Sequence, residues 1–126
     1  MAFELDITTL GTQLAGADLS AQANQYKFVK MSGAGVILAA VSGEKVLGIL
    51  ANKPASGDVA EVTVEAVAFP VLAGAAFAAG AFLMTDATGR AITAATTGST
   101  IVGQALEAAS AAGDIVTMRL ATIGVV

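Results

Sequence analysis

Residues 79–120 read AGAFLMTDATGRAITAATTGSTIVGQALEAASAAGDIVTMRL, and this stretch decides the fold. Short runs rich in apolar and β-branched residues alternate in it with small turn clusters at nearly regular spacing. The runs cover residues 82–85, 90–93, 101–106 and 115–120, with turns expected at 86–89 and 113–114. Runs of this length between Gly, Asp, Ser and Thr clusters are typical of β-hairpins. The stretch therefore predicts a series of antiparallel strands.

The same signals continue upstream, from Gln25 onward. Further strands are expected at 26–29, 36–41, 45–51 and 59–67, with a tight hairpin at 42–44. The alternation is clearest in 59–67, where every second side chain is expected to face inward. The inward set is Val62, Val64 and Ala66, and the set expected to face water is Glu61, Thr63 and Glu65.

The N-terminal segment has a different character. Phe3, Leu5 and Ile7 alternate with polar residues, and the chain then enters a stretch of Gly, Ala, Ser, Gln and Asn. This pattern indicates a short strand on a flexible connector. We expect two parts, an N-terminal arm or connector at residues 1–24 and a single β domain at residues 25–126.

The pattern as a whole defines a fold class. About seven or eight short strands are joined by hairpin-length turns. The best helical composition, at residues 106–112, spans barely two turns and would be marginal alone. We predict an all-β, mainly β protein: a small antiparallel β-barrel or a compact β-sandwich with an extended N-terminal arm.

Composition excludes several classes of function. The chain has no Cys and no His, so it lacks thiol nucleophiles, disulfides and the usual residue for acid–base catalysis near neutral pH. A formal net charge of −4, with six Lys and Arg in total, argues against nucleic acid as a partner. Only 13% of residues are charged while 56% are apolar. We expect a protein that buries surface against other subunits.

One long uncharged window could suggest a membrane span. Residues 66–85 carry no charge, but Pro70, Gly74 and Gly80 interrupt them and the flanks are acidic instead of basic or aromatic. The N-terminus has neither a basic region nor a continuous apolar run, so it does not resemble a signal peptide. We expect no membrane partner, and assembly inside a cell.

No group of residues indicates catalysis. On a strand, Glu61 and Glu65 would lie on one exposed face roughly 13 Å apart, too far for a glycosidase pair. Asp86 begins a turn and lacks the further carboxylates of a calcium loop. The serines have no histidine base, and the glycines lack a phosphate-binding motif. We predict no catalytic, cofactor-binding or metal site, no cofactor, and no enzyme activity.

Three segments carry a family resemblance: GILANKPASGDVAEVTVEAVAFPV, AAGAFLMTDATGRAI and TIVGQALEAASAAGDIVTMRL. Their glycine turns follow a characteristic order. The positions are Gly48, Gly57-Asp58, Gly80, Gly89, the run 101–105 and Gly113-Asp114. Over about residues 25–121 the chain resembles the small capsid decoration, or cement, proteins of tailed bacteriophages, also called head-stabilising proteins.

The resemblance implies a structural virion protein. Such a protein binds the outer surface of the mature phage capsid after assembly in the host cytoplasm. It stabilises the capsid by bridging subunits of the major capsid protein. The resemblance also implies self-association, and by analogy we expect a homotrimer.

The alternating residues of the N-terminal segment are the candidate contact site. We expect Phe3, Leu5, Ile7 and Leu10 to form an arm that adds a strand to an exposed capsid edge. A disordered tail is the alternative for this segment.

Two other functions stay open at this point. One is a virion surface fibre or adhesin module that binds a host-surface ligand such as a glycan. It would need exposed aromatic residues, and the chain has one Tyr and no Trp. The other is an accessory domain of an enzyme.

Overall fold

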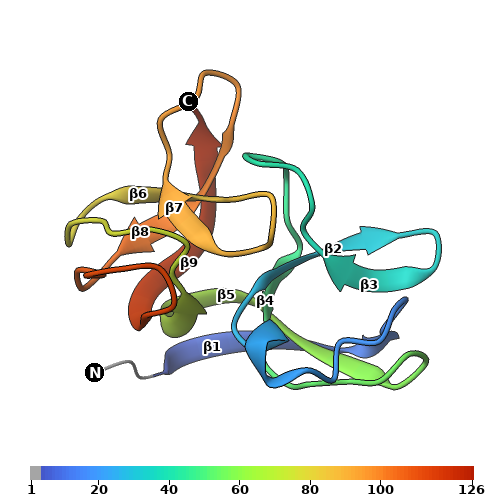
Figure 1. Cartoon of the computed structure of the whole chain (residues 1–126). Helices are drawn as coiled ribbons and strands as arrows, with labels where there is room; N and C mark the ends of the chain where they lie inside the picture. The colour runs from blue at the N-terminus through green and yellow to red at the C-terminus, as the bar shows by residue number, and fades with distance from the viewer. Residues whose placement is uncertain (1–3) are drawn as a thin grey trace.

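A computed structural model describes residues 4–126, and it shows one curled antiparallel sheet in the shape of a half-barrel (Figure 1). The described residues form no α-helix, and their one helical turn is the 3₁₀ segment η1 (Gln22–Asn24). The strands are β1 (Leu5–Leu14), β2 (Phe28–Ser32), β3 (Gly35–Leu38), β4 (Gly48–Leu50), β5 (Val59–Leu72), β6 (Phe82–Thr85), β7 (Ala91–Thr93), β8 (Thr100–Ala105) and β9 (Ile115–Val125). The predicted all-β class is confirmed.

The long strand β5 organises the sheet. The strand order is β3-β2-β4-β5-β9-β8-β6-β7, and β1 pairs with β5 outside this path. Val62 lies opposite Leu10 of β1 on one side and Leu50 of β4 on the other. Ala66 lies between Ile7 of β1 and Leu120 of β9. One edge of β5 therefore carries β1, and the other carries β4 and then β9.

The C-terminal part of the prediction agrees closely with the structure. β6 has the predicted bounds, and it forms a hairpin with β7 across the turn at residues 86–89. β8 and β9 pair as predicted, although β9 continues five residues further than expected, to Val125. β7 and β8 do not pair with each other, because β6 lies between them in the sheet.

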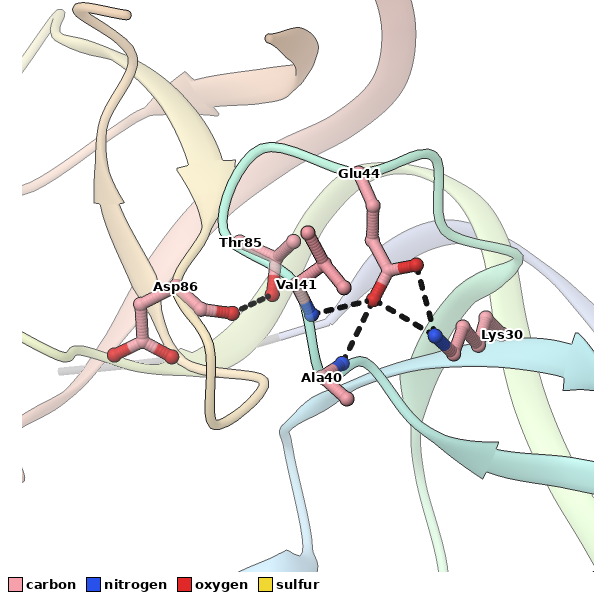
Figure 2. A network of polar contacts seen from close by, with 6 residues as sticks. All are labelled: Lys30, Ala40, Val41, Glu44, Thr85 and Asp86. Atoms are coloured by element: carbon pink, nitrogen blue, oxygen red, sulfur yellow. Dashed lines mark hydrogen bonds and ion pairs between the residues drawn. The ribbon is translucent and has the colours of Figure 1, made fainter.

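The hairpin predicted at residues 42–44 is wrong. β2 lies between β3 and β4 and pairs with both, so the two strands are not neighbours. The segment between them is a loop held by Glu44, whose carboxylate accepts hydrogen bonds from the amides of Ala40 and Val41 at 2.7 and 2.8 Å (Figure 2). The Nζ of Lys30 donates to the same carboxylate at 2.9 Å.

Two apolar clusters make up the core. The larger one lies around Phe28, Ile49 and Phe69 and includes residues of β2, β4, β5, β6, β7, β8 and β9. The smaller one, around Val29, Leu50 and Val62, also contains Ala15 and Leu19 from the segment that follows β1. Successive residues of β4 enter different clusters, so this part of the sheet is buried on both faces.

Burial on both faces explains a second wrong prediction. Thr63 was expected to face water, but it is fully buried opposite Ile49. Val62 is buried as predicted, and Glu61 and Glu65 are exposed as predicted. Where both faces of a strand are covered, alternation between apolar and polar residues no longer separates inside from outside.

Candidate functional site

The predicted contact residues lie on β1, at an edge of the sheet. Leu5 lies opposite Ala68, Ile7 opposite Ala66 and Leu10 opposite Val62. Phe3 lies outside the described residues. β1 and its partner are offset twice along their length, between Thr8 and Thr9 and again between Leu10 and Gln13. The structure thus brings three of the four predicted residues together on one strand.

These side chains are only partly covered. Leu5 is 48% exposed and Ile7 is 41% exposed, whereas Leu10 is half-buried. The predicted arm ends at Leu10 and leaves out Leu14, which is also half exposed and lies opposite the exposed Val59. The signal for it was the next leucine beyond Gly11, and β1 continues through Gly11 to reach it.

The outer edge of β1 is unpaired. Within residues 4–126, β5 is the one strand that pairs with β1, and the parallel bridge between Ala15 and Val36 comes after its end. One row of β1 amides and carbonyls therefore faces outward, which is the arrangement that another chain can extend. Asp6, on this strand, has a φ of 48°, so the backbone is distorted between Leu5 and Ile7. Its charge and the kink both discourage unspecific pairing at the edge.

The segment predicted as a connector is tied to the domain. The amide of Ala15 donates to the carbonyl of Asp58 at 2.8 Å, and the amide of Leu19 donates to that of Pro54 at 2.9 Å. Asp18 accepts hydrogen bonds from the hydroxyl and the amide of Ser20, which together hold the pKa of Asp18 below its ordinary value. The division of the chain after residue 24 stays a prediction.

Two further acidic residues, Asp86 and Asp114, build turns. Asp86 Oδ1 accepts hydrogen bonds from the amides of Thr88 and Arg90, both at 2.8 Å. Burial raises the pKa of Asp86, but these bonds, the Thr88 hydroxyl and the Arg90 charge outweigh it, so that the pKa lies below its ordinary value. Asp114 accepts from the amides of Ser110 and Ala111 in the same way.

Chemistry-bearing groups do not gather elsewhere in the described part of the chain. Residues 4–126 contain no group of three or more His, Cys, Asp or Glu side chains placed to hold a metal ion. No helix among them has the length and apolar character needed to cross a membrane. The surface instead carries exposed aliphatic side chains on several strands, among them Val67, Ile115 and Val125.

Fold and surface together define a small all-β module, in which a curled antiparallel sheet presents an unpaired strand edge and exposed apolar side chains among residues 4–126. The chain belongs to the phage cement protein family, whose model matches residues 21–120. It is therefore a structural protein of the phage virion, associated with the capsid, as the resemblance predicted.

A solved structure supports the fold. The chain is similar to the head fiber gp8.5 N base in bacteriophage phi29, with a TM-score of 0.66 and 19% sequence identity. The similarity covers 92% of this chain and 98% of that chain. A search of curated proteins finds no match.

Proposed function

We propose that this protein binds the outer surface of the mature capsid and stabilises it by bridging neighbouring subunits of the major capsid protein. The observation that carries the proposal is the unpaired outer edge of β1, with Leu5 and Ile7 exposed beside it. Membership of the cement family supplies the partner class. Assembly takes place in the host cytoplasm, and copies associate as a homotrimer.

Strand addition explains how such an edge would bind. A capsid strand laid beside β1 would satisfy its outward amides and carbonyls, which supplies affinity with little dependence on sequence. The predicted arm residues Phe3, Leu5, Ile7 and Leu10 would set the register through alternate side chains. In this arrangement the capsid strand extends the protein's own sheet, and β1 keeps its place against β5.

Preference for the mature lattice makes binding stabilising. A protein that binds only the expanded capsid lowers the free energy of that form of the capsid by mass action. At each site the gain is about 1.4 kcal/mol for every tenfold excess of free protein over Kd. Because a capsid offers many equivalent sites, modest single-site affinity gives a large total effect. The net charge of −4 keeps unbound copies soluble.

A pair of proline variants tests the edge directly. Ile7 and Thr8 are neighbours in regular register with Ala66 and Glu65, so the amide of one points toward β5 and that of the other points outward. Proline at the outward position removes a donor from the free edge and leaves the β1–β5 pairing intact. We would make I7P and T8P and measure melting temperature and occupancy on capsids stripped of the protein.

The expected result is that one variant keeps the wild-type melting temperature yet loses capsid occupancy at least tenfold. Deletion of residues 2–12 should abolish occupancy. If the stably folded proline variant and the deletion both bind like wild type, β1 does not contact the capsid. Heat resistance of wild-type and protein-free virions tests stabilisation separately.

The adhesin alternative predicts a different location. Of the described aromatic side chains, Phe82 is the exposed one, which offers a sugar ring little to stack on. Electron microscopy of virions with and without the protein separates the two functions. Regular protrusions over the capsid support cementing, and density confined to the tail tip would support an adhesin.

A further inference from the structure

We propose that copies of this chain associate through a C-terminal ribbon, made of residues 94–102 and 121–126. The inference rests on the proposed homotrimer and names its contact surface. Beyond Leu120, β9 has left β5 and pairs with β8 alone, with Thr100 opposite Val125 and Ile101 opposite Gly124. The ribbon lies at the top of Figure 1, and β1 lies at the bottom.

The ribbon carries no charged side chain, although the chain has a net charge of −4. Identical acidic proteins repel each other, so a contact between copies is favoured where neither copy brings acidic side chains to it. An uncharged surface is where such copies can approach at the lowest electrostatic cost. Depletion of charge is also what distinguishes the centre of an interface from other surface.

The ribbon also exposes apolar side chains. Ile123 is 43% exposed and Val125 is 63% exposed, and Val126 is exposed beside them. A two-stranded ribbon with such residues in water is marginally stable unless it packs against something. Its outer edge, where β5 no longer pairs, is free to receive a neighbour.

A groove beside the ribbon offers a receptor for such a side chain. It has a volume of about 190 Å³ and a mostly apolar lining: Lys45, Val46, Thr100, Thr122, Gly124 and Val125. Ile123 does not line this groove, and its side chain lies on the opposite face of the strand from that of its neighbour Thr122. One copy can therefore insert Ile123 into the groove of the next.

This contact joins two different surfaces, and contacts of that kind close into a ring when repeated by rotation. A ring formed by the ribbons leaves β1, at the other end of Figure 1, free to meet the capsid. Several β1 edges held in one ring would reach several capsid subunits at once, and such multivalent binding raises occupancy without new contacts.

A charge-insertion variant tests the surface. I123K places a cation in the contact, and L106K is its matched control, because Leu106 is 47% exposed and follows the end of β8 that lies opposite the ribbon. By analytical ultracentrifugation, wild type and L106K should sediment as the same multiple of 12.3 kDa, and I123K as a monomer. Circular dichroism melts check that both variants fold. A multimeric I123K would overturn the proposal.

Cysteine pairing tests the geometry independently, because the native chain has no cysteine. The double variant I123C/V46C should give a ladder of disulfide-linked oligomers on mild oxidation, whereas V46C alone should give none. Cross-linked dimers from I123C alone would show a symmetric contact and overturn insertion into the groove. Absence of cross-links both in solution and on capsids would overturn the ribbon contact altogether.

Capsid occupancy separates this proposal from the function on which it rests. If wild type binds capsids but neither assay finds the ribbon contact, the ribbon inference fails and the cement function stands. If wild type forms the cross-linked ring but does not bind capsids, the cement function fails and the ribbon contact stands.

Discussion

Glu44 and Lys30 form an ion pair 2.9 Å long that joins the loop after β3 to the middle of β2. The same carboxylate accepts the amides of Ala40 and Val41, so one side chain satisfies three donors (Figure 2). The loop it holds also reaches the other half of the sheet, because the amide of Gly43 donates to the carbonyl of Thr85 at 2.8 Å. Glu44 thus fixes the position of a loop that connects both halves of the molecule.

Replacing this carboxylate should destabilise the fold. E44Q keeps the size of the side chain but removes the charge that strengthens all three hydrogen bonds, and we expect a loss of about 1–2 kcal/mol in the free energy of unfolding. E65Q is the matched control, because Glu65 is exposed on β5, and its effect should stay within about 0.5 kcal/mol. Urea unfolding of the three proteins measures both values. Equal stability of E44Q and wild type would show that the loop does not depend on Glu44.

Acid should lower the stability of the fold, because it protonates carboxylates that accept hydrogen bonds in the folded protein. Burial raises the pKa of Glu44, but Lys30 and the loop amides outweigh it, so the pKa lies below its ordinary value of 4.5. Asp86 likewise has a pKa below its ordinary value of 3.8. For a lowered pKa, the unfolded chain takes up its proton first as the pH falls, so the stabilisation is complete above these ordinary values.

The melting temperature should therefore be nearly constant from pH 7 to about pH 5 and then fall steeply below about pH 4. Thermal melts across this range check the expectation, and in the double variant E44Q/D86N the fall should be shallower. A double variant with the wild-type slope would assign the acid sensitivity to other groups.

Gly48 lies close against the backbone of β5. A Cβ built there would clash with the carbonyl oxygen of Thr63, which cannot move without breaking the β4–β5 pairing. G48A should cost about 1–3 kcal/mol in the free energy of unfolding. G33A is the control, since a Cβ there meets nothing within 4 Å, and its effect should be small. Denaturant titration compares the two, and a G48A protein as stable as G33A would contradict the contact.

The sequence predicted strands where local pattern decides them. Residues 82–85 form a strand with the predicted bounds, because a turn at 86–89 follows at once and the strand pairs with its chain neighbour. The pattern failed at residues 42–44, where β2 inserts between β3 and β4. Strand order is set by contacts between distant segments, and a local turn signal carries no information about them.

The candidate site was predictable in part for the same reason. The alternation of Leu5 and Ile7 indicated a strand, and the structure has one. Its pairing with β5 depends on residues some sixty positions away and could not be read from the arm. The ribbon could not be predicted from the sequence. Its residues 121–126 continue β9 beyond the last residue that pairs with β5, and the end of that pairing is seen only in the sheet topology.

Replacing Thr63 and Thr85 with valine should change the free energy of unfolding in opposite directions. Both are fully buried, but in the described part of the chain Thr63 Oγ1 has no hydrogen-bond partner, whereas Thr85 Oγ1 donates to the carbonyl of Asp86 at 2.9 Å (Figure 2). Valine has nearly the same shape as threonine but carries a methyl group in place of the hydroxyl. T63V should raise the free energy of unfolding by about 1 kcal/mol, because an unsatisfied polar group leaves the core. T85V should lower it by about 1 kcal/mol, because a hydrogen bond is lost. Chemical denaturation measures both, and a shift of the two variants in the same direction would show that the Thr63 hydroxyl is satisfied in solution.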